Sequence, residues 1–228
     1  VQTDPNSQHV IDAMNSLDLL VVQEIFMSET AKLATVVLPG TTFLEKDGTF
    51  TNTERRIQRV NKAVEPLPGT KPDGVIVTDM MQKLGFKQPD YNADQVLAEI
   101  ADVVPFFKGV TRERLGKLGL QWPVQEDGTD TQILHKETFK LGKGRLKNFD
   151  FKESAEIENN KKEYPLILTT SRVLQHYNAA TMTRRTRNIN IVDEDVLLVH
   201  PKDAEKRELN TGDIGRLYSG RGEVALKV

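Results

Sequence analysis

An amide and a carboxylate, Gln23 and Glu24, lie near the end of the apolar run DLLVVQEIF. This run predicts a strand over residues 18–26 that is buried on both faces of a parallel sheet. Ligands of open parallel sheets bind beyond the carboxyl ends of the strands, so these side chains are candidates to read a purine edge or a ribose. Capping and turn formation before the next helix is the alternative for the same two residues.

A second carboxylate, Asp73, ends a loop that is rich in proline and glycine. Apolar residues recur at helical spacing from Val75 to Leu84, and Gly85 follows them. The simplest prediction is therefore that Asp73 is the N-cap of a helix. A ligand-binding carboxylate is the alternative.

The segment of residues 170–187, TSRVLQHYNAATMTRRTR, contains four arginines and no acidic residue. Guanidinium groups match phosphate oxygens in a bidentate geometry, and the hydroxyl, amide and imidazole groups between them suit a phosphorylated heteroaromatic ligand. A solvated basic loop is the alternative, because runs of one charge are usually exposed. RNA binding through arginine stays open, although a net charge of −2 and an aromatic content of 6% argue against nucleic acid.

Composition excludes several kinds of chemistry. The 228 residues contain no cysteine, which removes disulfides, thiol nucleophiles and cysteine-ligated zinc or iron–sulfur sites from this chain. The four histidines are far apart in the sequence, so a metal site made of protein ligands alone is not expected. No Walker A, GxSxG or GxGxxG motif occurs. The longest apolar runs fall well short of the roughly 20 residues of a membrane helix, so we expect no membrane span.

Elements of α/β character must position the first candidate groups. Ser28 is the expected N-cap of a short helix over residues 29–34, and residues 35–38 follow as a second buried strand. A strand, a helix and a strand in such close succession indicate a parallel sheet. Residues 49–53 suit a further strand, and residues 93–104 suit an amphipathic helix.

The second half of the chain is mainly β in character. Loops and short hairpins are predicted over residues 106–162, and residues 152–163 are predicted to be a charged linker. Strands are predicted at residues 165–171, 196–200, 214–219 and 223–228, with one short helix over 201–208.

Two long stretches resemble the molybdopterin oxidoreductases. The first is VVQEIFMSETAKLATVVLPGTTFLEKDGTFTNTERRIQRVNKAVEPLPGTKPD, and it is most similar to the catalytic (alpha) subunits of formate dehydrogenases. The second, LILTTSRVLQHYNAATMTRRT with HPKDAEKRELNTGDIGRLYSGRGEVALKV, resembles the molybdopterin dinucleotide-binding domain of that family. Between them, FFKGVTRERLGKLGLQWPV resembles the formate dehydrogenase branch. The resemblance is collinear over almost the whole chain.

The resemblance implies that the candidate residues bind a bis-molybdopterin guanine dinucleotide (bis-MGD) cofactor. Gln23 and Glu24 would lie at one nucleotide, with the turn at Gly40 close by, and Asp73 would contact a guanine edge. The other pterin or its phosphates would contact Arg172, His176, Tyr177 and Asn178, with Thr183 behind them. No catalytic residue and no metal ligand is expected within the 228 residues.

The implied fold is α/β: a parallel-sheet segment of a molybdopterin oxidoreductase domain, then a β-rich, double-psi-barrel-like dinucleotide-binding domain. We expect the first at residues 1–105, a connecting region at 106–162 and part of the second at 163–228. The family's cysteine or selenocysteine metal ligand and iron–sulfur motifs do not occur in the sequence. We therefore expect a truncated piece of a longer polypeptide, with iron–sulfur clusters in the upstream part and no formate turnover by this piece alone.

The implied function is that of the cofactor-binding portion of a molybdenum or tungsten formate dehydrogenase, which oxidises formate to CO2 and passes electrons to NAD or another acceptor. The expected partners are the remainder of the catalytic polypeptide and electron-transfer subunits, in the cytoplasm and without nucleic acid. Two alternatives stay open. One is a non-formate molybdopterin-fold subunit of a respiratory NADH dehydrogenase, and the other is a stand-alone module that binds a nucleotide cofactor.

Overall fold

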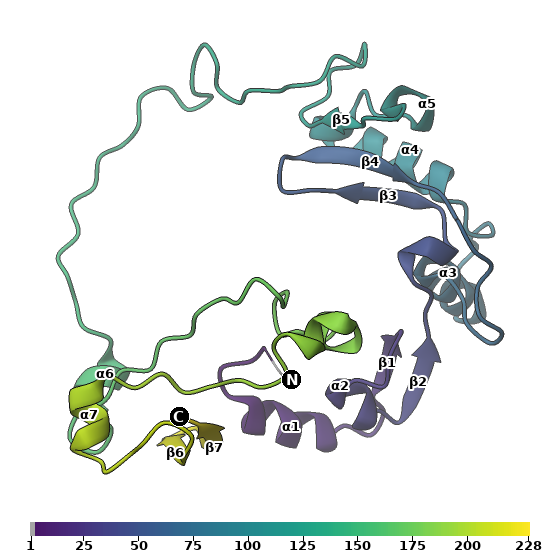
Figure 1. The fold of residues 1–228 in the computed structure, drawn as a ribbon. Helices are drawn as coiled ribbons and strands as arrows, with labels where there is room; N and C mark the ends of the chain where they lie inside the picture. The colour runs from purple at the N-terminus through teal and green to yellow at the C-terminus, as the bar shows by residue number, and fades with distance from the viewer. Residues whose placement is uncertain (1–2) are drawn as a thin grey trace. The chain divides into compact units, whose positions relative to one another are not determined.

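A computed structural model describes residues 3–228, apart from the side chain of Glu156 (Figure 1). The described chain forms two compact units. The sheet unit comprises residues 21–27 and 34–147, and the terminal unit comprises residues 3–20, 28–33 and 148–228. Residues 1 and 2, which open the first predicted domain, lie outside the described residues, and the predicted boundaries at 105 and 162 stay a prediction.

The sheet unit contains most of the regular structure. Its elements are β1 (Val21–Glu24), β2 (Val36–Pro39), the 3-10 turn η1 (Phe43–Glu45), β3 (Gly48–Thr51), β4 (Arg56–Val60), α3 (Asp73–Lys83), α4 (Ala93–Val103), η2 (Pro105–Phe107), α5 (Arg112–Leu115) and β5 (Leu120–Gln121). None of the helices that residues 3–228 form is long and apolar enough to cross a membrane.

A parallel pair of strands opens the sheet unit, which confirms the parallel sheet predicted from the sequence. β1 pairs with β2 in a register that runs from Val21 and Val36 to Glu24 and Pro39. The prediction that these strands are buried on both faces is wrong for this structure. A sheet of two strands leaves their side chains open, so Val21 and Val36 are 40% and 42% exposed.

A three-stranded antiparallel sheet, in the order β3–β4–β5, carries the core of the sheet unit. Ile57 of β4 is fully buried and clusters with Leu97 of α4, Leu115 of α5, Val110 and Val124. Figure 1 shows α4 against one face of this sheet. Burying a side chain of this size stabilises a fold by about 1.5–3 kcal/mol, so the cluster holds α4 and α5 to β4.

Helix signals place α3 and α4 correctly. The Asn92 side chain caps α4 by accepting two backbone N–H groups, and Gly85 follows α3 with φ +90°, the left-handed conformation that favours glycine after a helix. The prediction that Asp73 caps α3 is wrong. Pro72 stands at the N-cap position and Asp73 is the first helical residue, because its carboxylate is bound by Gln23 and Lys46 instead.

The terminal unit has less regular structure. Its elements are α1 (Ser7–Asn15), α2 (Glu29–Lys32), α6 (Ala155–Asn160), the 3-10 turns η3 (Thr183–Arg185) and η4 (Arg187–Asn190), α7 (Pro201–Glu205), β6 (Ile214–Ser219) and β7 (Gly222–Lys227). Ser28 caps α2 by accepting the N–H of Ala31, as predicted. β6 and β7 form where two strands were predicted and pair with each other as an antiparallel hairpin, and Val196 forms one parallel bridge to Lys227.

The strand predicted at residues 165–171 is not formed in the described structure. A strand needs a neighbour for its backbone N–H and C=O groups. No segment of residues 3–228 pairs with this one, and Leu166, Ile167 and Leu168 are 50%, 78% and 61% exposed. The segment has the apolar composition of a strand, but composition alone does not supply the neighbouring strand that its backbone needs.

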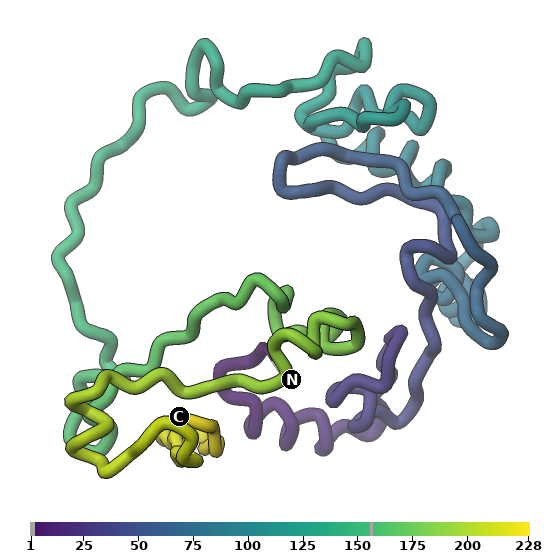
Figure 2. The backbone as a smooth tube through the Cα atoms, in the orientation of Figure 1, coloured from purple at the N-terminus to yellow at the C-terminus, as the bar shows by residue number. Residues whose placement is uncertain are grey.

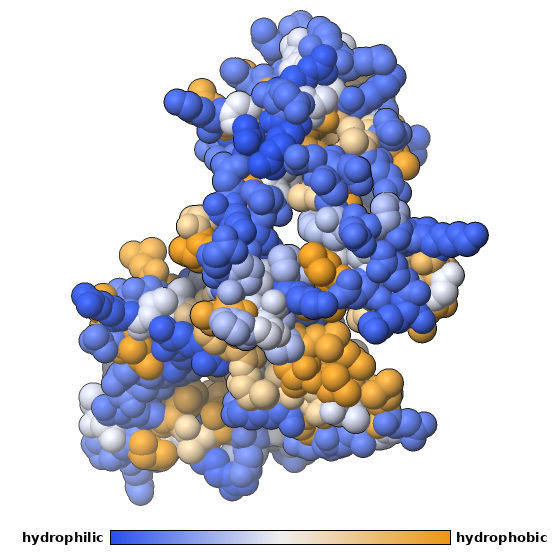
Figure 3. Space-filling view, turned by 90° about the vertical axis from the view of Figure 1, so that its right-hand side faces the viewer, coloured by the Kyte–Doolittle hydropathy of each residue, from blue (hydrophilic) through white to orange (hydrophobic). Residues whose placement is uncertain are grey.

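Residues 139–152, which we call the exposed segment, form neither helix nor strand, and after a turn at residues 139–142 the backbone is largely extended (Figure 2). Leu141, Leu146 and Phe151 in this segment are 95%, 101% and 91% exposed. Apolar side chains also reach the surface elsewhere, as the orange patches of Figure 3 show. Many large apolar side chains of the described residues therefore remain in contact with solvent.

Candidate nucleotide-binding site

The carboxyl ends of β1 and β2 bring three of the sequence-predicted residues together. The Gln23 amide donates a hydrogen bond to Oδ1 of Asp73, and a Cβ added to Gly40 would stand 3.2 Å from the same oxygen. The Gly40 N–H donates to the Glu24 carbonyl over 3.0 Å, and Gly40 forms a parallel bridge with Lys71. These contacts fix the start of α3 beside the strand ends, where glycine leaves the space that Asp73 uses.

A lysine that the sequence analysis missed completes this cluster. Lys46 follows η1, and its ammonium group donates to Oδ2 of Asp73 and lies 3.4 Å from the Thr41 carbonyl. Its side chain is 25% exposed and that of Asp73 is 50% exposed. In the sequence Lys46 reads as part of a turn, and a separation of 27 residues from Asp73 carries no periodic signal. The one signal that could have indicated Lys46 is its positive charge in a turn after the second strand.

The Asp73 carboxyl is held ionised by its neighbours. Burial by itself raises the pKa of Asp73, but hydrogen bonds from Lys46 and Gln23 and the positive charge of Lys46 outweigh burial and lower this pKa below its ordinary value. The cluster therefore presents a carboxylate, an ammonium and an amide side by side at neutral pH.

Glu24 is directed to its own turn. Its carboxylate oxygen Oε1 accepts the backbone N–H of Ile25 over 2.9 Å. This contact is the turn-forming role that the sequence left open beside a ligand-binding role. Glu24 thus contributes to the strand end through its backbone carbonyl, which accepts from Gly40, as well as through its side chain.

A hollow of about 290 Å³ adjoins Lys46 and Asp73 within the sheet unit. Its lining is mostly apolar and includes the rings of Phe43 and Phe50, which meet edge to face with centroids 6.0 Å apart. Tyr91 forms another part of the wall. An apolar hollow with a few convergent polar groups is typical of sites for small molecules, and this volume suits a flat ring system.

A second set of predicted residues lies in the terminal unit, where His176 and Thr183 bind each other. His176 Nδ1 lies 3.0 Å from Thr183 Oγ1, and Nε2 lies 2.7 Å from the Val192 carbonyl oxygen. Because a carbonyl only accepts, the neutral imidazole places its proton on Nε2 and accepts the Thr183 hydroxyl at Nδ1. The backbone N–H of Tyr177 also donates to Thr183 Oγ1. The three residues thus brace one turn.

The turn after Tyr177 carries backbone strain. Asn178 and Ala180 have φ of +50° and +60°, and Ala180 is buried. Such left-handed residues other than glycine cost about 1–2 kcal/mol each and cluster at functional sites. The hydrogen bonds of His176 and Thr183 hold the chain in this conformation, which presents Tyr177 and Asn178 to solvent.

The arginines of this segment divide into two kinds. Arg184 is paired with Asp195 over 2.9 Å and serves the unit itself. The exposed guanidinium groups of Arg172 and Arg187 make no hydrogen bond or ion pair with residues 3–228. Only the latter kind keeps its charge available for an anion, so the structure separates what the sequence showed as one basic run.

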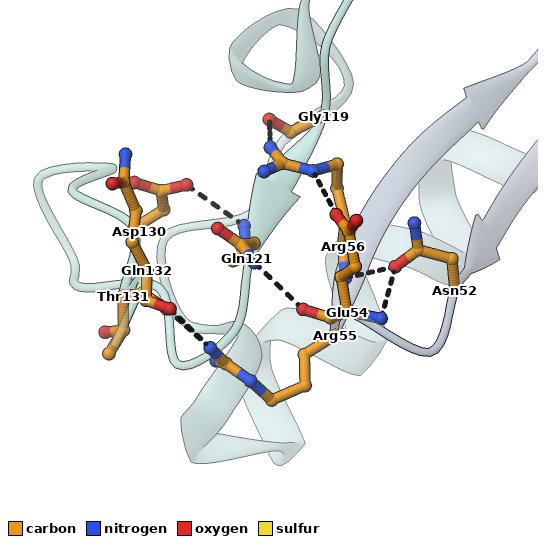
Figure 4. Close-up of polar contacts among 9 residues, drawn as sticks. All are labelled: Asn52, Glu54, Arg55, Arg56, Gly119, Gln121, Asp130, Thr131 and Gln132. Atoms are coloured by element: carbon orange, nitrogen blue, oxygen red, sulfur yellow. Dashed lines mark hydrogen bonds and ion pairs between the residues drawn. The ribbon is translucent and has the colours of Figure 1, made fainter. Parts of the chain in front are cut away.

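A third polar cluster, shown in Figure 4, holds the sheet unit together. Arg55 of the strongly basic run 54–62 donates to the carbonyls of Thr131 and Gln132, each over 3.0 Å, and to that of Trp122. Gln121 donates to the Glu54 carbonyl over 3.0 Å. These side chains point at backbone groups of the same unit, so this cluster is structural.

A parallel strand pair and separate antiparallel sheets place the chain among the mixed α/β proteins. In open parallel sheets, ligands bind beyond the carboxyl ends of the strands. Comparison with family models defines the chain further. Residues 1–83 match the model described as "Molybdopterin oxidoreductase", and residues 166–228 match "Molydopterin dinucleotide binding domain". Both stretches thus match domains of molybdopterin oxidoreductases, as the resemblance indicated.

Curated relatives extend the similarity over the whole chain. The F420-dependent formate dehydrogenase subunit alpha of Methanocaldococcus jannaschii is 43% identical over 100% of this chain and 34% of its own length. The F420-dependent formate dehydrogenase 2 subunit alpha of Methanococcus maripaludis is 44% identical over 97% of this chain and 33% of its own length. The chain therefore spans about a third of the length of these relatives.

Among solved structures, acetylene hydratase from Pelobacter acetylenicus superposes with a TM-score of 0.68 over 97% of this chain and 32% of its own chain. The sequence identity is 23%, so this similarity concerns the fold alone.

A molybdopterin cofactor carrying molybdenum or tungsten follows from the family, and the described residues fit one. The Asp73 cluster offers hydrogen-bond donors and acceptors beside a hollow that suits a flat ring. Next to Gly40, the Thr41 hydroxyl is buried and has no hydrogen-bond partner among the described residues. The unpaired arginines of the terminal unit suit phosphates.

Proposed function

We propose that this chain is the cofactor-binding portion of the catalytic subunit of a molybdenum- or tungsten-dependent formate dehydrogenase, which oxidises formate to CO2. The observation that carries the proposal is an identity of 43–44% with two formate dehydrogenase alpha subunits over nearly all 228 residues. The similarity to acetylene hydratase, at 23% identity, concerns the fold alone. The reaction is therefore inferred from the formate dehydrogenase relatives.

The chain's part in this function is to bind a bis-MGD cofactor. Gln23, Glu24, Gly40 and Asp73 bind one guanine nucleotide. In the terminal unit, the residues assigned to the other pterin and its phosphates are Arg172, His176, Tyr177, Asn178 and Thr183. His176 and Thr183 act by positioning, because both imidazole nitrogens are already hydrogen-bonded to Thr183 and to the Val192 carbonyl of the same unit.

When bound, the cofactor supplies the redox centre that takes two electrons from formate. The residues of this chain orient it: the Asp73 carboxylate accepts N–H groups of the base, and the Arg172 guanidinium neutralises phosphate charge. The sequence contains no cysteine, so a thiolate ligand for the metal comes from another part of the polypeptide. Iron–sulfur clusters, electron-transfer subunits and an acceptor such as NAD complete the proposed enzyme, which we place in the cytoplasm without a nucleic-acid partner.

The test is purification of the full-length polypeptide that contains this chain. We expect bound molybdenum or tungsten, GMP released from the cofactor by acid hydrolysis, and formate-dependent dye reduction. Asp73→Ala and Arg172→Ala each lower the GMP content, whereas Lys62→Met, which changes an exposed lysine paired with Glu65, leaves it unchanged. A protein fully loaded with metal and cofactor that does not oxidise formate would contradict the formate assignment. A protein without pterin would contradict the cofactor assignment.

A further inference from the structure

The ammonium group of Lys46 has more donors than its neighbours use. It carries three N–H groups. One donates to Oδ2 of Asp73 and one is directed to the Thr41 carbonyl 3.4 Å away. The side chain is a quarter exposed and lines the hollow beside Asp73. A third N–H is therefore available to a ligand in that hollow.

The Asp73 carboxylate likewise has more acceptor sites than its neighbours use. An ionised carboxylate has about two lone-pair sites on each oxygen. The Gln23 amide takes one site on Oδ1, and the Lys46 ammonium takes one on Oδ2. With half of the side chain exposed, each oxygen keeps one site for a ligand. The pair thus offers one donor next to two acceptors.

That order of groups is complementary to one purine and not to the other. Along its pairing edge guanine carries an acceptor, O6, followed by two donors, N1–H and the 2-amino group. Adenine carries a donor, the 6-amino group, where guanine has O6. An ammonium at that position attracts O6 and leaves the 6-amino group of adenine facing another donor.

The walls of the hollow fit the remainder of a purine. Phe43 and Phe50 are about half exposed, at 51% and 53%, although they line the hollow together. Aromatic faces of this kind stack on a base whatever its identity. The rings therefore supply affinity, and the selection among bases falls to the polar pair at the edge of the hollow.

We propose that Lys46 is the specificity-determining residue of the nucleotide site: it donates to O6 of guanine while Asp73 accepts N1–H and the 2-amino group. This inference rests on the proposed function, which places a guanine nucleotide in the sheet unit. It assigns discrimination to a side chain outside the nine residues predicted from the sequence. In this proposal Lys46 and Asp73 recognise the base together, and their ion pair is not merely structural.

The test compares three probes, GMP, IMP and AMP, by calorimetric titration of the full-length protein purified without cofactor. IMP keeps O6 and N1–H but lacks the 2-amino group. We expect Lys46→Met to weaken GMP and IMP binding by the same factor, about tenfold for a charge-assisted hydrogen bond, and to leave AMP binding unchanged. Asp73→Asn should weaken GMP more than IMP, because only GMP has the second donor.

Two further variants keep the test decisive. Lys46→Arg retains a donor and is expected to keep the preference for GMP over AMP, which separates the O6 contact from a role in folding. Lys62→Met removes an exposed lysine outside the hollow and should change nothing. The inference is overturned if Lys46→Met keeps the wild-type preference, if it weakens all three probes equally, or if the wild-type protein binds none of them.

Failure of this inference is distinguishable from failure of the proposed function. If the Lys46 variants leave base preference unchanged while the holoenzyme contains bis-MGD and oxidises formate, only the role of Lys46 is wrong. If the native protein contains no pterin and does not oxidise formate, the proposed function is wrong whatever the probes show.

Discussion

Asp73 is the residue at which a local rule and a tertiary contact compete. An aspartate before an amphipathic stretch is typical of an N-cap, and capping is worth about 1 kcal/mol. In the structure the carboxylate instead accepts from Gln23 and Lys46, 50 and 27 residues away. An ammonium offers a charged partner that a backbone N–H cannot match. The sequence predicts the position of Asp73 at the start of α3, but it does not predict which groups its side chain binds.

This contact makes stability depend on pH. The pKa of Asp73 is lowered in the folded protein, so its contribution is fully present above the ordinary carboxyl pKa and is lost as pH falls through the folded value. The side chain is half exposed, so we expect Asp73→Asn to cost only about 0.5 kcal/mol at pH 7. Urea unfolding at pH 7 and pH 3 should show this difference shrinking at low pH. A difference that stays constant between the two would contradict it.

At His176 the sequence predicts which residues lie together, but it does not predict what their side chains do. The sequence groups His176, Tyr177 and Thr183 as ligand-binding candidates, and the structure does bring them together. They contact one another, because a turn with Asn178 and Ala180 at positive φ needs side-chain hydrogen bonds to hold it. Composition cannot separate a residue that touches a ligand from one that positions the residue that does.

At the scale of the element, the start of α3 depends on a close approach to the chain before α4. A Cβ added to Gly74 would come within 2.1 Å of the Tyr91 ring. We expect Gly74→Ala to destabilise the protein by about 1–3 kcal/mol, because the ring or the helix must shift. In a Tyr91→Ala background the same change should cost little. A double-mutant cycle by urea unfolding measures this coupling, and equal costs in both backgrounds would refute the contact.

Arg55 joins β4 to the loop that follows β5. It donates to three backbone carbonyls of that loop, and its guanidinium lies 5.6 Å from the centroid of the Trp122 ring. We expect Arg55→Met to lower the free energy of unfolding by about 2 kcal/mol, because three backbone carbonyls lose a charged donor. Amide hydrogen exchange should increase at residues 121–132.

The neighbouring Arg59 provides the matched control for this variant. It is exposed, and its side chain makes one long hydrogen bond of 3.4 Å, to Asn61. Arg59→Met should therefore leave stability nearly unchanged. If both variants have the same effect, the contribution of Arg55 is one of general charge and not of its three hydrogen bonds.

Elements defined by local signals were predictable, and elements defined by a distant partner were not. The cap at Ser28 and the strands β6 and β7 depend on residues close in sequence, and each forms as predicted. The segment 165–171 has the composition of a strand but no pairing partner among residues 3–228. For the site, Gln23, Gly40 and Asp73 followed from strand ends and resemblance, whereas Lys46 required the fold.

On the scale of the whole molecule, the two units differ in how much apolar surface they bury. The sheet unit contains the cluster around Ile57, together with Ile76. In the described part of the terminal unit, the buried apolar residues are Ala31 and Ala180. Since burial of apolar area is the main driving force for folding, we expect the sheet unit to be the more stable of the two.

This difference, together with the exposed segment, predicts where a protease cuts first. Trypsin needs an extended, accessible chain beside lysine or arginine, and the exposed segment offers Lys140, Lys143, Arg145 and Lys147 without helix or strand. By contrast, Arg55 and Arg56 are partly buried and hydrogen-bonded in the sheet unit. We expect cleavage within residues 140–147 to be at least about tenfold faster than at Arg55 or Arg56, because local opening there costs almost no free energy. Intact-mass spectrometry of a short digestion measures the order of cuts. First cleavage inside β4 would show that the core around Ile57 does not protect the strand, and would overturn this account of where the molecule is stable.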